Sequence, residues 1–189
     1  MNAWANFIGY QITWFIVVDS AARNHASIGL AAAAAFVGGQ LVLSAWCAVD
    51  LRLIAGALIL GATIDGALSA LGWVRYADAA FALPPGGAPV WILSLWAAFA
   101  LTLSRSLAWL QRRPWLAALL GAGGGPLAYW SAERGFNAVE FVPPQERAVI
   151  GLALGWVVAI PTLLYLLRRW TPVSRIPAAG GAPSEAGSR

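Results

Sequence analysis

The sequence carries little charge and few residues that bind metals. Charged residues make up 11% of its 189 residues, whereas soluble domains carry about 25%. It has no lysine, one histidine (His25) and one cysteine (Cys47). A single cysteine excludes an intrachain disulfide, and one histidine with one cysteine argues against a zinc or haem site. This composition disfavours an ordinary water-soluble fold, and we expect neither a metal nor a cofactor.

The chain is instead rich in long apolar runs. Hydrophobic residues make up 60% of it, and about 20 such residues in a row suffice to cross a bilayer. Six runs meet or approach that length: Ala3–Val18, Ala26–Val49, Leu53–Val74, Pro89–Leu110, Pro114–Ala132 and Ala148–Leu167. The sequence therefore predicts an all-α polytopic membrane bundle of six transmembrane helices over residues 1–170. Residues 171–189, rich in proline, alanine, glycine and serine, are expected to form a disordered cytoplasmic tail.

Tryptophan and arginine indicate how these runs are placed in the membrane. Indole rings prefer the level of the lipid headgroups, and eight tryptophans fall at the ends of runs: Trp4, Trp46, Trp73, Trp91, Trp109, Trp115, Trp130 and Trp170. The pairs Arg112–Arg113 and Arg168–Arg169 follow even-numbered runs. Because cytoplasmic loops are enriched in basic residues, both termini are expected in the cytoplasm. Heavy use of alanine, arginine and glycine without lysine suggests a bacterial source, and hence the inner membrane.

Asp65 is the most informative single residue. A carboxylate in the middle of a span costs about 2.5–3.5 kcal/mol on insertion scales. Gly61 and Ser69 lie one helical turn before and after it, so it projects from a small, polar face into the bundle. It is either a proton-bearing or ligand-binding carboxyl, or a structural residue that ties helices together by hydrogen bonds. Arg105 lies near the end of its run, and we expect its side chain to extend toward the membrane surface.

The segment Gly121–Pro126 is the second unusual feature. Four glycines and a proline stand in the middle of the fifth run. Glycine costs about 1 kcal/mol and proline about 3 kcal/mol at an interior helix position. The fifth helix is therefore expected to be broken here, which would open backbone groups toward a site. The alternative is a proline kink that allows close helix packing.

Three of these features are expected at one depth. Helices rise about 1.5 Å per residue, which places Gln11, Asp65 and Gly124 roughly 12–14 Å below the outer face. The predicted binding site thus comprises Gln11, Asp65 and the three glycines Gly123, Gly124 and Gly125. Its lining is completed by Trp14 and Trp96, two of the three tryptophans that lie deep in their runs; the third is Trp156. At least one of the two mid-span amides, Gln11 in the first run and Gln40 in the second, is expected to join helices instead.

No catalytic template is present. The sequence contains no Gly-x-Ser-x-Gly, no His-Glu-x-x-His and no phosphate loop. We therefore expect no catalytic residues, and a binding or structural protein rather than an enzyme. Its arginines lie at the ends of apolar runs and form no basic face, so nucleic acid is not an expected partner.

Several segments resemble a family of bacterial inner-membrane domains of unknown function. The matching residues are Asn6-Phe7, Gln11, Trp14-Phe15, Asp65-Gly66, Pro89–Leu103, Ser106–Leu110 and Gly121–Tyr129. The resemblance covers roughly residues 1–170 and carries no catalytic assignment. It implies a lipid-related accessory role, because its members tend to be encoded near enzymes of the cyclopropane-fatty-acid-synthase kind.

The sequence leaves two functions open. One is the binding or handling of a lipid or small amphiphile at the internal polar site, with membrane lipids as partners. The other is a structural or assembly role beside membrane or peripheral lipid-modifying enzymes, in which the polar residues only hold helices together. An open pocket touching Asp65 would favour the first, and a fully packed Asp65 the second.

Overall fold

The computed structural model describes residues 2–171 of the chain and is mostly helical. The tail predicted over residues 171–189 lies, apart from Thr171, outside the described residues. Six α-helices follow in order: α1 (Ala3–Ala22), α2 (Ala26–Val42), α3 (Cys47–Ala70), α4 (Val90–Leu103), α5 (Pro114–Phe136) and α6 (Glu146–Trp170). A short 3₁₀-helix, η1 (Ala108–Arg112), lies between α4 and α5. The all-α class predicted from the apolar runs is correct for this part of the chain.

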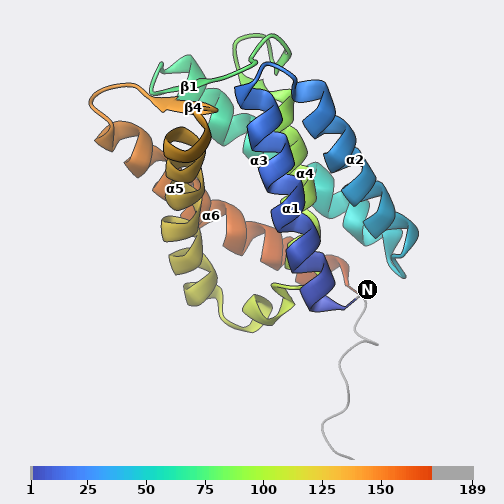
Figure 1. Cartoon of the computed structure of the whole chain (residues 1–189). Helices are drawn as coiled ribbons and strands as arrows, with labels where there is room; N and C mark the ends of the chain where they lie inside the picture. Colours follow the sequence, from blue (N-terminus) through green and yellow to red (C-terminus); the bar gives the residue numbers. More distant parts are fainter. Residues whose placement is uncertain (1, 172–189) are drawn as a thin grey trace, which may run out of the picture.

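Four short strands cover one end of the bundle. They are β1 (Val74–Tyr76), β2 (Ala82–Leu83), β3 (Ala88–Pro89) and β4 (Val139–Phe141). Strand β1 pairs antiparallel with β4, placing Tyr76 opposite Val139, and β2 pairs with β3. Figure 1 shows β1 and β4 at the end opposite the N-terminus. The segment between α3 and α4 and the segment between α5 and α6 are therefore joined through β1 and β4.

Successive helices run in alternating directions, so the beginning of α1 and the end of α6 lie at the same end of the bundle (Figure 1). At that end the Ser106 hydroxyl donates to the Asn6 side chain of α1, and Arg168 of α6 donates to the Gln111 carbonyl of η1. At the opposite end the backbone amide of Ala26 donates to the Asp78 carboxylate, 2.8 Å away.

Two of the described helices, α3 and α6, are long and apolar enough to cross a bilayer by length and composition. Only 28% of the most apolar stretch of each is buried, so most of that surface faces outward, as in a membrane. Helices α2 and α4 are apolar but shorter, at 17 and 14 residues. Helix α4 rises about 21 Å over its fourteen residues. It is this short because the chain turns at Ser104 and then forms η1. This structure therefore supports a membrane protein, and the full six-span arrangement remains a proposal.

The expected break in the fifth helix is wrong: α5 is continuous from Pro114 to Phe136, with Pro126 inside it. Close packing against α6 explains why. A Cβ at Gly121 would lie 2.4 Å from the Trp156 carbonyl oxygen, and one at Gly125 would lie 2.4 Å from the Trp156 ring. The glycines thus let the two helices approach, and that packing outweighs low helix propensity. Of the alternative interpretation, the close helix packing is confirmed.

Candidate functional site

Asp65 is the centre of a buried hydrogen-bonded cluster. Its carboxyl group is completely buried in α3. One oxygen accepts from the Tyr76 hydroxyl at 2.9 Å and from the Tyr129 hydroxyl. The other accepts from Trp96 Nε1 at 2.7 Å. Helices α4 and α5 and strand β1 are therefore all tied to α3 through one side chain.

Gly61 makes this arrangement possible. It lies one turn before Asp65 on the same face of α3. A Cβ at Gly61 would lie 2.4 Å from Cδ1 of the Trp96 ring. The indole ring therefore lies directly over the Gly61 backbone, which brings its Nε1 to the carboxyl group one turn away.

Tyr76 approaches the cluster from the strands at the end of the bundle. Burial, and secondly the charge of nearby Asp65, raise the pKa of Tyr76 well above its usual value. Its phenol therefore keeps its proton and acts as a donor. The ring of Tyr76 also packs edge-on against Trp91, with centroids 6.1 Å apart, which fixes its position.

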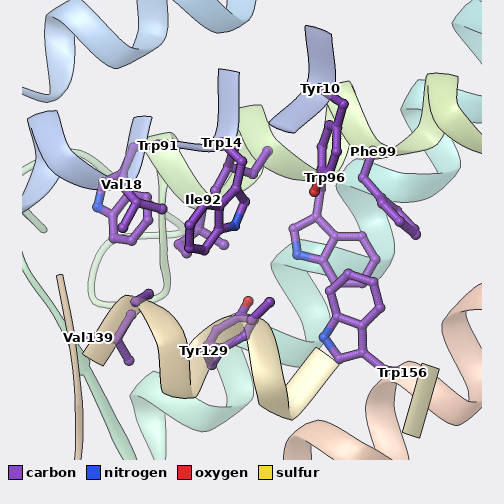
Figure 2. A pocket seen from close by; sticks show the side chains of 13 residues that line it. Tyr10, Trp14, Val18, Trp91, Ile92, Trp96, Phe99, Tyr129, Val139 and Trp156 are labelled. Atoms are coloured by element: carbon purple, nitrogen blue, oxygen red, sulfur yellow. The ribbon is translucent and has the colours of Figure 1, made fainter. Parts of the chain in front are cut away.

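An aromatic pocket adjoins this cluster (Figure 2). It has a volume of about 50 Å³, which exceeds the roughly 10–15 Å³ that one water needs. Helices α1, α4, α5 and α6 line it, with Val139 of β4 at one edge. Trp96 and Tyr129, two of the three Asp65 partners, belong to its wall. Asp65 itself does not line the pocket.

The rim of the pocket lies on the flanks of helices. Four of its lining residues are half-buried, namely Tyr10 and Trp14 of α1, Phe99 of α4 and Ala128 of α5, whereas the others are buried. These four residues stand within helices, and none belongs to a loop. The partly exposed lining residues therefore lie along the helices and not in the loops at the capped end of the bundle.

Trp156 of α6 forms the inner wall together with Trp96. Their rings stack with centroids 4.4 Å apart and an interplanar angle of 18°, and Phe99 packs edge-on against Trp156 at 5.2 Å. Trp156 is 9% exposed. Its Nε1 atom is buried and has no hydrogen-bond partner within the described part of the chain, which is unusual because buried donors are nearly always paired.

The predicted site residues do not all converge. Gln11 is exposed on α1, and its side chain makes no hydrogen bond with a described residue. Gly123 and Gly124 are exposed on α5, where nothing lies within 4 Å of an added Cβ. The expected site of Gln11, Asp65 and open backbone at one depth is therefore wrong. Equal depth does not bring side chains together when they point to different sides of their helices.

Trp14, Trp96 and Gly125 do lie at or beside the pocket. Trp14 and Trp96 line it, and Gly125 provides the surface on which the Trp156 ring rests. Their role in binding stays a prediction. Tyr129 and Trp156 were missed as lining residues, although Tyr129 follows Pro126 by less than one turn and Trp156 is a tryptophan far from any run end.

A second polar cluster lies at the other end of the bundle. Arg105 donates to Asp50 at 2.7 Å and to the Gln40 carbonyl at 3.2 Å. Asp50 also accepts from the Ser44 hydroxyl at 2.6 Å, and the Gln40 side chain accepts from Asn6 at 3.2 Å. Arg105 is therefore held at this end of the bundle by a part-buried ion pair with Asp50, whose side chain is 5% exposed. Gln40 joins α1 and α2, as predicted.

The aromatic pocket is the candidate binding site among the described residues. Within residues 2–171, no group of three or more metal-binding side chains comes together. Asp65 is saturated with donors from the protein, and the Asp50–Arg105 pair adjoins no pocket described above. The aromatic pocket is the feature with room for another molecule.

The fold and this pocket define a class of protein: a membrane-compatible helical bundle with an internal aromatic pocket backed by a buried carboxyl group. The chain belongs to the family described as protein of unknown function (DUF2878), whose model matches residues 3–162. No curated protein and no solved structure matches the chain. The pocket is therefore the feature that bears on the function of the protein.

Proposed function

We propose that this protein is an integral membrane protein that binds a lipid or small amphiphile in its aromatic pocket. The observation that carries the proposal is a pocket lined by apolar and aromatic side chains whose rim stands on helix flanks. In a bilayer such a mouth faces acyl chains and not water. An apolar molecule could then enter sideways, without crossing the strands that cap the bundle.

The proposal places all six helices in the membrane. Large apolar side chains are exposed not only on α3 and α6 but also on other helices. Examples are Ile12 on α1 and Leu127 on α5, which are 55% and 59% exposed. Exposed surface of this kind is favourable in lipid and costly in water. The end that carries the double arginines at 112–113 and 168–169 would face the cytoplasm of a bacterial inner membrane.

In this account Asp65 positions the pocket wall without touching the ligand. Its oxygens hold the Trp96 ring and the Tyr129 ring at fixed angles. A rigid wall lowers the entropic cost of binding, because the side chains are ordered before the ligand arrives. Asp65 is accordingly a positioning residue.

Photo-crosslinking tests the proposal directly. The full chain is placed in lipid nanodiscs with a fatty-acyl methyl ester that carries a diazirine near its carbonyl. Labelled peptides are identified by mass spectrometry. We expect labelling of α1, α4 and α5 around the pocket, and strong loss of it in Ala128→Leu, which fills the rim.

Gly123→Leu is the matched control. It adds a leucine side chain to the same helix at an exposed position with no atom within 4 Å of a Cβ. Labelling of the pocket should be unchanged in this variant. Equal labelling of wild type and Ala128→Leu, or labelling spread evenly over the outer helix surfaces, would refute binding in the pocket.

A second candidate function is a structural or assembly role beside membrane lipid-modifying enzymes. The observation that favours it is the complete saturation of Asp65 by protein donors. In that case the polar residues serve helix packing alone. Wild-type protein would then show no specific labelling of the pocket, while Asp65 variants would lose stability to the same extent as they do under the first proposal.

A further inference from the structure

We infer that the ligand presents a neutral oxygen acceptor, such as the carbonyl of an ester, ketone or acid in its uncharged form, to Nε1 of Trp156. This inference rests on the proposed function and names the chemistry of the molecule bound. The observation behind it is the buried indole nitrogen of Trp156, which has no partner.

The indole nitrogen of Trp156 can only donate. In Figure 2 the nitrogens of Trp96 and Trp156 both point to the side on which Tyr129 stands. Trp96 has Asp65 as its acceptor, but Trp156, which stacks on Trp96, has none among residues 2–171. A buried donor without an acceptor is destabilising, so a ligand that supplies an oxygen there removes this penalty.

The Trp156 ring is not free to turn toward another partner. One side of the ring stacks on Trp96, and its pyrrole edge contacts Gly125 of α5, where an added Cβ would lie 2.4 Å from both Cδ1 and Cγ. Phe99 packs against it edge-on. The missing acceptor must therefore come to the ring, since the ring cannot move to an acceptor.

The charge of the pocket sets the class of acceptor. None of the residues lining it is Asp, Glu, Lys, Arg or His. Asp65 is completely buried behind Trp96 and Tyr129, so it offers no site for an ammonium group. Arg105 is held by Asp50 at the other end, so it offers none for a phosphate or a carboxylate. A neutral oxygen on an apolar chain is what remains.

Tyr10 offers a second polar contact at the rim. Its ring packs near Phe99, with centroids 6.0 Å apart, and its hydroxyl points toward Trp96 in Figure 2. That hydroxyl makes no hydrogen bond with a residue in the described part of the chain. A carbonyl oxygen at Trp156 would leave the remainder of the molecule to pass Tyr10 and Ala128 toward the lipid.

A pair of probes isolates this hydrogen bond. The first is the diazirine-bearing fatty-acyl methyl ester, and the second is a hydrocarbon of the same length with the diazirine at the same carbon. Competition of each probe with its unlabelled form gives its affinity for wild type, Trp156→Phe and Trp130→Phe. Trp130 is 52% exposed on α5 and is the control for loss of an indole.

We expect Trp156→Phe to lower the affinity of the ester by about three- to tenfold, the size of one hydrogen bond, and to leave the hydrocarbon unchanged. Trp130→Phe should change neither. Replacement of residue 156 by 3-benzothienylalanine, which keeps both rings but has no N–H, should repeat the selective loss. Equal changes for both probes, or full ester affinity with benzothienylalanine, would overturn the inference while the proposed function stands. Absence of pocket labelling by either probe in wild type would overturn both.

Discussion

Replacement of Asp65 by leucine is expected to destabilise the protein far more than replacement by asparagine. Leucine leaves three donors without their acceptor: Trp96 Nε1, the Tyr76 hydroxyl and the Tyr129 hydroxyl. Each stranded donor costs about 1–3 kcal/mol. The hydroxyls can rotate to reduce that cost, but the indole of Trp96 is fixed by its stack on Trp156.

These contributions give an expected loss of about 3 kcal/mol in the free energy of unfolding for Asp65→Leu. Asparagine keeps one oxygen for Trp96 and offers its NH₂ group to the phenol oxygens, so Asp65→Asn should cost about 1 kcal/mol. At about 2–4 °C per kcal/mol for a chain of this size, the leucine variant should melt about 6–12 °C lower.

Thermal unfolding in a mild detergent, followed by circular dichroism, measures these shifts. Thr63→Val is the matched control, because Thr63 is exposed on α3 and its hydroxyl bonds only to the Ile59 carbonyl of its own helix. Its melting temperature should stay near that of wild type. An Asp65→Leu variant as stable as Thr63→Val would show that the cluster does not hold the helices together.

Three further outcomes follow from the packing and the topology. Gly121→Ala should destabilise the protein, because its Cβ would lie 2.4 Å from a backbone oxygen of α6, whereas Gly124→Ala should be neutral or stabilising by up to about 1 kcal/mol; equal melting temperatures would contradict this helix contact. Arg105→Met should lower the free energy of unfolding by about 3–5 kcal/mol, because it leaves the Asp50 carboxylate buried and unpaired. Glu140→Gln, which breaks an exposed pair, should lower it by less than about 1 kcal/mol in chemical unfolding. Similar losses for the two variants would show that the Arg105 pair is effectively solvated. In a chain whose own cysteine is replaced by serine, Glu140→Cys and Gln111→Cys should react with an impermeant thiol reagent from opposite sides of the membrane, and reaction from the same side would refute the alternating topology.

The helices could be predicted from the sequence because their signal is local. Long apolar runs with at most one charged residue locate all six, and several boundaries agree closely, as for Ala3 and Pro114 at the starts of α1 and α5. The end of α4 was missed. Its run continues to Leu110, but Ser104 and Arg105 bond to Asp50 across the bundle, and these contacts end the helix at Leu103.

The site could be predicted only in part, because depth along a helix is easier to derive than direction around it. The sequence identified Asp65 as a residue that faces the inside of the bundle, in a functional or a structural role, yet its partners Tyr76 and Tyr129 come from distant segments. Gln11 lies one residue after Tyr10 and so faces outward while Tyr10 faces the pocket. That difference of about 100° depends on which helices pack together.

The Asp50–Arg105 pair shows where the same reasoning could have gone further. The predicted topology already placed both residues near the cytoplasmic end of the bundle. A charged residue within a span generally has a partner of opposite charge at its own depth, and Asp50 was available. The predicted break in α5 was wrong for a different reason. Helix propensity measured in isolated helices takes no account of close packing against Trp156.

An experimental structure of the full chain in lipid tests the central claim most directly. Density in the aromatic pocket between α1, α4 and α5 would be examined at side-chain resolution. The account predicts an elongated apolar molecule that enters past Tyr10 and Ala128, with an oxygen within about 3.2 Å of Trp156 Nε1. A pocket that is closed by its own side chains, with the Trp156 nitrogen bonded to protein, would contradict it.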